Sequence, residues 1–349
     1  MKKVNFNAFL GGALILSIVG CKQGAKDHPE VNSVVSEISY TEDASDVSLD
    51  AWADAPKKEI VDWVTAVTTE GSSDFIPVQD RIAVFDNDGT LWPEQPVPNQ
   101  AQFMLDYLKK EMPNHPEWQK NPVASAAVKG DFEPLKKAGI KGLIDLIQKT
   151  HSNKTEDDFN NSVRQWIDTT KSKRFGKLYT EAVYLPMLQL LDYLRAHQFK
   201  TFIVSGGGAD FMRVWTEDIY GIPPYQVVGT YGEVKYEVVD GKPTLSKVPG
   251  AIFVDDKTEK PEAIHRFIGK KPVFCGGNSD GDQAMMQYTS SSKYKSMCVI
   301  LHHTDAEREF AYDTKTLSGH LETALVEAKE KNWLVVDMKN DFKKIFSFQ

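Results

Sequence analysis

Apolar residues gather in short runs from residue 82 onward, with polar or turn-forming residues between the runs. The runs lack the alternation of apolar and polar positions that marks a half-buried strand, and they are too short for typical helices. Continuous runs of this kind are typical of strands that are buried on both faces of a parallel sheet. We therefore predict strands at residues 82–85, 202–204, 272–274, 297–301 and 334–336.

Helical patterns separate several of these runs. Apolar residues recur at helical spacing over residues 60–67, and residues 185–194 are rich in leucine. Pro261 suits the first turn of a further helix over residues 261–268. Strands that alternate with helices indicate an α/β domain with a doubly wound, mostly parallel sheet.

Two segments depart from this alternation. Residues 93–185 contain no convincing strand, and their charged residues with intermittent aromatics predict several helices inserted after the first strand. Residues 233–247 surround Asp240-Gly241, a pair that favours tight hairpin turns. We therefore expect a core formed by residues 56–92 and 186–349, with a hairpin in it, and a helical cap formed by residues 93–185.

The first 55 residues differ from the rest of the chain. Lysines at positions 2 and 3 precede a short apolar run, Phe9–Val19, and this pattern is typical of a secretory signal. The residues before Cys21 resemble the lipobox of bacterial lipoproteins, where the cysteine becomes an acylated N-terminus. The resemblance implies a signal peptide over residues 1–20, a flexible tether over residues 21–55, and a lipid anchor at Cys21 in the periplasm or cell envelope. A plain signal peptide with an incidental cysteine is the alternative.

The composition narrows the classes of partner. The 349 residues are 41% hydrophobic and 26% charged, as in ordinary globular proteins. A net charge of −8 leaves no basic surplus for a nucleic-acid backbone, so we expect no nucleic-acid partner. Cys275 and Cys298 lie in apolar runs, which predicts buried thiols, with a disulfide as the alternative in an oxidising compartment. The sequence leaves the oligomeric state open.

Two aspartates directly follow the first predicted strand. Asp86 and Asp88 belong to the segment Asp-Asn-Asp-Gly-Thr-Leu after the run 82–85. Ligands of open α/β sheets bind at the carboxyl ends of the strands, so both carboxylates are candidates for such a site. A calcium loop would need more oxygen ligands and a distant glutamate, which the apolar residues after Thr90 disfavour.

The next predicted strand ends at Ser205, with three glycines behind it. Glycines let a backbone approach an anion closely, so this segment is a candidate phosphate site. A dinucleotide-binding turn would need a further glycine where Phe211 stands, which disfavours that alternative.

Two more polar segments follow. Lys260 precedes the helix over residues 261–268, and Lys257 is the alternative lysine at this place. The acidic turn Gly277-Asn278-Ser279-Asp280-Gly281-Asp282 comes directly after a predicted strand.

These four segments, in this order over residues 82–286, resemble the motifs of the haloacid dehalogenase superfamily, in particular its phosphoserine-phosphatase-like and phosphorylcholine-phosphatase-like members. The resemblance implies that Asp86 is the nucleophile and that Asp88 is the general acid and base. The residues that it implies for phosphate binding are Thr90, Ser205, Gly206, Gly207 and Lys260. The residues that it implies for Mg²⁺ binding are Asp86, Asp88, Asn278 and Asp282.

Position 278 departs from the common form of the last motif, because the family often has Asp there and this chain has Asn. An amide oxygen ligates Mg²⁺ with one negative charge fewer. Asp280 and Asp282 are the candidates to compensate for that charge.

The implied activity is Mg²⁺-dependent hydrolysis of a small phosphorylated metabolite through an aspartyl-phosphate, outside the cytoplasm. Asp88 favours a phosphatase over a dehalogenase, since a halide leaves without a proton. A lipoprotein that binds phosphate compounds with little or no turnover is the alternative function, and Asn278 is the reason to consider it.

The cap is expected to cover the site and to contact the leaving group. The candidate contact residues are Trp92, Trp118, Arg164, Trp166, Arg174 and Tyr184. His302-His303 is predicted to lie in an exposed loop rather than in a second metal site.

Overall fold

The computed structural model of the chain describes residues 47–316 and 318–349. The predicted signal peptide, Cys21 and residues 21–46 of the predicted tether lie outside these residues. At the end of the predicted tether, Leu49, Ala51 and Trp52 are buried and a helix begins at Asp54, so the chain packs on the core before residue 56. No helix in the described part of the chain is both long and apolar enough to cross a membrane.

A sheet in the order β2-β5-β4-β3-β1-β6-β7-β8 forms the centre of the fold. Strands β4, β3, β1, β6, β7 and β8 run parallel to one another, whereas β5 is antiparallel to β4 and β2 is antiparallel to β5. The strands are β1 Ile82–Phe85, β2 Lys154–Thr155, β3 Lys200–Gly208, β4 Val227–Val239, β5 Lys242–Phe253, β6 Phe274–Gly277, β7 Met297–His302 and β8 Leu334–Asp337. The mostly parallel sheet predicted from the apolar runs is confirmed.

Helices cover both faces of the parallel part of the sheet. Alternate residues of β1 face opposite sides: Ala83 and Phe85 pack in one apolar cluster, and Ile82 and Val84 pack in another. The first cluster includes apolar residues of α1 and α7, and the second includes residues of α10, α11 and α12. The fold is therefore doubly wound, as predicted, and β1 is buried on both faces.

The helices of the core are α1 Asp54–Thr68, α7 Leu185–Ala196, α8 Ala209–Arg213, α9 Thr216–Tyr220, α10 Glu259–Ala263, α11 Gln283–Ser290, α12 Thr323–Lys331 and α13 Met338–Asp341. Short 3₁₀ helices occupy Val78–Asp80 and Pro224–Gln226. The helix predicted over residues 261–268 begins earlier, at Glu259, and continues as a π-helical turn over Ile264–Ile268.

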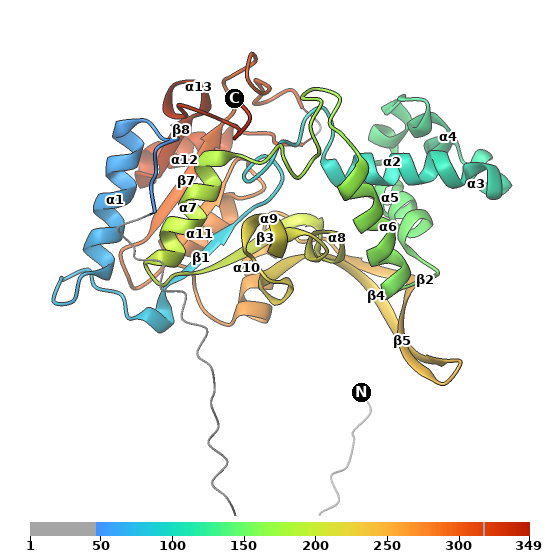
Figure 1. Cartoon of the computed structure of the whole chain (residues 1–349), viewed down its shortest axis with the longest axis horizontal. Helices are drawn as coiled ribbons and strands as arrows, with labels where there is room; N and C mark the ends of the chain where they lie inside the picture. The colour runs from blue at the N-terminus through green and yellow to red at the C-terminus, as the bar shows by residue number, and fades with distance from the viewer. Residues whose placement is uncertain (1–46, 317) are drawn as a thin grey trace, which may run out of the picture. The chain divides into compact units, whose positions relative to one another are not determined.

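A group of helices follows β1, as predicted, and lies beside the hairpin of β4 and β5 (Figure 1). Its elements are α2 Asn99–Glu111, a 3₁₀ helix Met112–Asn114, α3 Pro116–Gln119, α4 Pro122–Val128, α5 Glu133–His151 and α6 Glu156–Thr169. These helices have a small apolar cluster of their own, which includes Leu108, Trp118 and Leu146. Their limits as a separate domain, residues 93–185, stay a prediction.

The expectation that residues 93–185 contain no strand is wrong at one point. Lys154 and Thr155 form β2, which pairs with Lys247 and Ser246 of β5. The predicted hairpin is confirmed and is longer than expected, so its outer edge offers unpaired backbone groups that β2 satisfies. The hairpin thereby joins the core sheet to the helices that follow β1.

Gly276 fixes how closely β6 approaches the end of β1. It pairs with Phe85, and its carbonyl accepts a hydrogen bond of 3.0 Å from the amide of Asp86. A Cβ at position 276 would lie 2.7 Å from the ring of Phe85, which is fully buried and cannot retreat.

We predict that Gly276→Ala lowers the free energy of unfolding by about 1–3 kcal/mol, because overpacking strains a closed core. Urea unfolding measures the change. The control is Gly232→Ala on β4, where an added Cβ would meet only Ile252, at 3.9 Å. Equal stability of the two variants would contradict this account of Gly276.

Candidate active site

The predicted site residues come from the carboxyl ends of three adjacent strands. Asp86 follows β1, Ser205 lies near the end of β3, and the turn over residues 278–282 follows β6. β1 lies between β3 and β6 in the sheet, so these three ends are neighbours. Ligand sites of open α/β sheets form at this edge.

Lys260, on α10, connects these strand ends. Its Nζ donates to Asp86 Oδ1 at 2.8 Å, to Asp282 Oδ1 at 2.6 Å and to the Val204 carbonyl at 3.1 Å. The side chain is only 2% exposed. Burial opposes its charge, but the carboxylates of Asp282 and Asp86 raise its pKa well above the ordinary value. Lys260, and not Lys257, is thus the lysine that contacts Asp86.

The Asp86 carboxyl group is buried and that of Asp88 is partly buried, and each has a raised pKa. Burial raises the pKa of Asp86 to about 7, with Lys260 opposing the shift and Asp282 adding to it. Burial also raises the pKa of Asp88 to about 6, against a hydrogen bond of 2.8 Å from Trp92 Nε1 to its Oδ1. A protonated Asp88 is therefore accessible near neutral pH, as a general acid requires.

Ser205 and the glycines behind it form one wall of the cavity beside Asp86. The amide of Gly207 donates to Ser205 Oγ at 3.1 Å, and the amide of Gly208 donates to Gln100 Oε1 at 2.7 Å. Gln100 lies on α2, so the helices after β1 contact the glycine segment directly. Ser205 keeps its hydroxyl proton to donate to a bound anion.

Thr90 does not line the cavity. It is fully buried, and its Oγ1 donates to Asn278 Oδ1 at 3.1 Å. Its predicted role in substrate binding therefore lacks a direct path to the cavity, and the structure shows it instead as a support for Asn278.

The turn after β6 is closed by Asp282. Its Oδ2 accepts from the amides of Asn278 and Ser279 at 2.9 and 3.0 Å, and Lys260 occupies Oδ1. The residue is fully buried, so both oxygens serve the turn and the lysine. This geometry does not favour the predicted role of Asp282 as a direct metal ligand.

Asp280 is committed elsewhere as well. Its oxygens accept from the amides of Glu322, Thr323 and Ala324 at 2.9–3.2 Å, at the start of α12. Asp280 and Asp282 are the candidates to compensate for the charge missing at position 278. The carboxylates of both are therefore occupied by hydrogen bonds within the protein.

Glu94 is a buried carboxyl group that the sequence analysis missed. Its Oε1 accepts from Asn278 Nδ2 at 2.6 Å and from the Tyr312 hydroxyl at 2.8 Å. Burial raises its pKa to about 8, with repulsion from Asp88 and Asp86 adding to the shift and the Tyr312 hydrogen bond opposing it. No sequence motif marks Glu94, because its partners are distant along the chain.

The donor atoms fit a magnesium ion with a partly aqueous shell. Mg²⁺ prefers oxygen ligands and keeps several waters, so one or two carboxylates suffice. Asp86 Oδ2 and the main-chain carbonyl of Asp88 accept no hydrogen bond from the described residues. A cation there would also stabilise the charged forms of the neighbouring buried carboxyl groups. Within residues 47–316 and 318–349, no three His, Cys, Asp or Glu side chains are arranged to hold a metal directly.

The prediction of an exposed loop at His302-His303 is wrong for His303, which is 2% exposed. Its Nε2 donates to the Gly89 carbonyl at 2.8 Å, and its Nδ1 lies 3.1 Å from Glu309 Oε2. The ring also stacks on Tyr312, with centroids 4.3 Å apart. His303 therefore supports the loop that carries Asp88.

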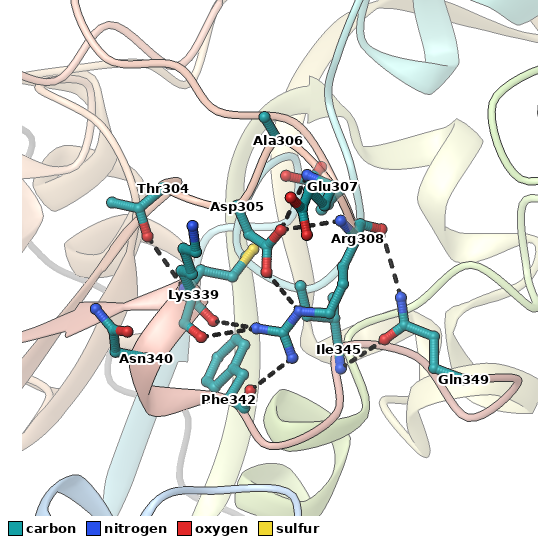
Figure 2. A network of polar contacts seen from close by, with 12 residues as sticks. Thr304, Asp305, Ala306, Glu307, Arg308, Lys339, Asn340, Phe342, Ile345 and Gln349 are labelled. Carbon is teal, nitrogen blue, oxygen red and sulfur yellow. Dashed lines mark hydrogen bonds and ion pairs between the residues drawn. The ribbon is translucent and has the colours of Figure 1, made fainter.

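Arg308 fixes the segment that follows His303 (Figure 2). Its guanidinium donates to the carbonyls of Phe342 and Lys339, at 2.8 Å in both cases, and pairs with Asp305. The C-terminal residues thereby fix the segment around His303, whose side chain in turn binds the Gly89 carbonyl.

The site opens into a cavity of about 650 Å³. Asp86, Asp88, Ser205 and Lys260 line its polar end, and Met104, Leu143 and Ile147 contribute apolar surface from α2 and α5. The six residues predicted to contact the leaving group do not line it: Trp92, Trp118, Arg164, Trp166, Arg174 and Tyr184. Four of them are buried aromatics, and Arg164 and Arg174 donate to main-chain carbonyls elsewhere.

The two cysteines after β5 are free thiols. Cys275 and Cys298 lie side by side in β6 and β7, and both are buried. The expectation of buried thiols is confirmed, and the described structure contains no disulfide between them.

The fold and this arrangement define a doubly wound α/β protein with an aspartate–lysine pair at the carboxyl edge of its central strand. A family model of haloacid dehalogenase-like hydrolases matches residues 83–287, and the chain belongs to that family.

The solved structures that the chain resembles have low sequence identity to it. A conserved functionally unknown protein from Anaerococcus prevotii DSM 20548 has a TM-score of 0.51 and 13% identity, over 73% of this chain and 87% of that one. A phosphoserine phosphohydrolase-like protein from Francisella tularensis subsp. tularensis SCHU S4 has a TM-score of 0.36 and 15% identity, over 72% and 98%. The first likeness shows the fold alone. No curated protein matches the chain by sequence.

The contacts of Asp282 lead to a prediction about stability without metal. We expect Asp282→Asn to lower the free energy of unfolding by about 3 kcal/mol in EDTA, because it breaks a buried ion pair and disturbs the turn. Chemical unfolding measures the change, and Asp280→Asn is the control, with about 1 kcal/mol or less expected since Asn also caps helices. If Asp282 served mainly as a metal ligand, removing its charge would instead stabilise the metal-free protein.

Proposed function

We propose that the protein is a Mg²⁺-dependent phosphomonoesterase that hydrolyses a small phosphorylated metabolite through an aspartyl-phosphate on Asp86. The observation that carries the proposal is the position of Asp86: its carboxylate ends the central strand, contacts Lys260 at 2.8 Å and lines the same cavity as Asp88 and Ser205. Membership of the hydrolase family supports the reaction class.

In the first step a carboxylate oxygen of Asp86 attacks phosphorus, and the bond from phosphorus to the leaving oxygen breaks. Lys260 and the hydroxyl of Ser205 offset the negative charge of the phosphoryl oxygens. Asp88 gives its proton to the leaving alkoxide, which departs as an alcohol.

In the second step Asp88, now ionised, takes a proton from water. The resulting hydroxide attacks phosphorus, the bond from phosphorus to Asp86 breaks, and inorganic phosphate leaves. Asp88 is then protonated again, so the cycle returns both aspartates to their starting states.

Mg²⁺ held by Asp86 and the main-chain carbonyl of Asp88 would supply positive charge beside the phosphate. The other two predicted magnesium ligands, Asn278 and Asp282, are both engaged in hydrogen bonds within the protein. The second candidate function, a phosphate-binding protein with little turnover, rests on the missing charge at Asn278.

We predict that Asp86→Asn lowers phosphate release from 4-nitrophenyl phosphate by more than about a thousandfold, because the nucleophile is lost. EDTA is expected to suppress the wild-type rate, and Asp62→Asn on the exposed side of α1 is the control with an unchanged rate. Activity that survives in Asp86→Asn would refute the mechanism. Binding of phosphate without release by the wild-type protein, across alkyl, sugar, nucleotide and choline phosphates, would favour the second candidate.

We also propose that the chain is exported and anchored to a bacterial membrane through lipid on Cys21. The proposal rests on the lysines at positions 2 and 3, the apolar run Phe9–Val19 and the residues before Cys21. The polar residues that follow would let the catalytic core reach substrates at a distance from the membrane surface.

We predict that the full chain, expressed in a bacterium with an alkyne fatty acid, incorporates the label and sediments with membranes. Cys21→Ser is expected to lose the label, whereas Cys298→Ser is the control that retains it. An unlabelled wild-type chain would contradict the anchor and leave the proposed hydrolysis untouched.

A further inference from the structure

We propose that Glu94 supplies the negative charge that the magnesium site lacks at Asn278. This inference rests on the proposed function, because it concerns the cation of that reaction. The family motif places this negative charge on position 278, in the turn after β6. We place it instead on Glu94, in the loop that follows Asp86.

Asn278 and Glu94 form a matched pair. Asn278 is 1% exposed, its Nδ2 donates to Glu94 Oε1 at 2.6 Å, and its Oδ1 accepts from Thr90. The nitrogen and the oxygen of the Asn278 amide therefore each have a hydrogen-bond partner. An aspartate at position 278 would place a second carboxylate against Glu94, and this like-charge contact is costly in a buried site. The amide at position 278 and the carboxylate at position 94 thus fit one another.

Glu94, rather than Asn278, faces the cavity together with Asp86 and Asp88. Donors from Asn278 and Tyr312 occupy its Oε1, whereas its Oε2 accepts no hydrogen bond from the described residues. The carboxylate is held in place on one side and has unused lone pairs on the other.

Two glycines make room for this carboxylate. A Cβ on Gly89 would lie 2.3 Å from Glu94 Oε1, and a Cβ on Gly319 would lie 2.2 Å from it. Both glycines also have positive φ angles, of 78° and 74°. Two separate segments of the chain therefore close around Glu94 at positions where only glycine fits.

The two acidic residues within the turn itself are already used. Asp282 binds Lys260 and two amides, and Asp280 binds the start of α12. Among the described residues, no three His, Cys, Asp or Glu side chains are arranged to hold a metal directly, and we therefore assign Glu94 to the water molecules around the cation. Carboxylates in this outer position commonly change metal affinity by about 10–100-fold.

The test is the affinity of the purified protein for Mn²⁺, measured from the EPR signal of the free ion. Glu94→Gln keeps an acceptor for Asn278 and Tyr312 but cannot ionise when a cation binds beside it. We expect it to bind Mn²⁺ at least about tenfold more weakly than the wild type. Glu59→Gln, the same chemical change at an exposed position of α1, is the matched control and is expected to stay within about threefold of the wild type.

A charge exchange provides the second arm. The double variant Glu94→Gln/Asn278→Asp restores the formal charge of the site, because it moves the carboxylate from position 94 to position 278. We expect its Mn²⁺ affinity to return to within about threefold of the wild type. This variant also serves if Glu94→Gln alone does not fold, because a tenfold weaker affinity in the double variant would overturn the proposal.

The outcomes separate this inference from the proposed function. Unchanged Mn²⁺ affinity in Glu94→Gln would overturn the role of Glu94 while phosphate release by the wild type stands. If the wild type binds no Mn²⁺, the inference fails together with the metal dependence of the reaction. Phosphate release that is absent despite Mn²⁺ binding would count against the enzyme alone.

Discussion

The buried ion pairs of Lys260 are the constraint on which the site depends. One ammonium group binds the carboxylate that ends β1, the carboxylate that closes the turn after β6, and a carbonyl of β3. A buried charge without partners would be strongly destabilising, so Lys260 and its carboxylates require one another. The three strand ends are thereby held at one point, and the orientation of Asp86 follows from the sheet rather than from a flexible loop.

The surroundings of this point balance several negative groups against one lysine. Asp86 and Glu94 are buried and Asp88 is partly buried, and removal from water raises the pKa of each. A raised pKa suits a proton donor at Asp88. A divalent cation beside these carboxyl groups would stabilise their ionised forms. Apolar side chains of α2 and α5 line another part of the cavity.

Much of the architecture could be predicted from the sequence, because strands buried on both faces leave continuous apolar runs. The run 82–85 locates β1, and the polar residues after such runs must gather at one edge of a parallel sheet. That argument alone places Asp86 and Ser205 together. The choice between Lys257 and Lys260 needed the structure, since both precede the helix predicted over residues 261–268 and only Lys260 reaches Asp86.

What the sequence could not predict is how buried polar groups pair across long separations. Glu94 contacts residues 278 and 312, and His303 contacts Gly89, through loops with no regular pattern. Asp282 matches a metal-binding motif in spacing, but its oxygens are used by Lys260 and two amides. Such assignments depend on which donors lie nearby in three dimensions, and periodicity and motif spacing carry no information about that.

The central claim is that the phosphoryl group passes through the carboxylate of Asp86. Acid quenching of the wild-type protein during turnover, followed by mass spectrometry of its peptides, tests this claim directly. The account predicts a phosphoryl group on the peptide that contains Asp86, accumulating during turnover and lost when substrate is exhausted. Phosphate release without any phosphorylated peptide, or with the phosphoryl group on another residue, would contradict it.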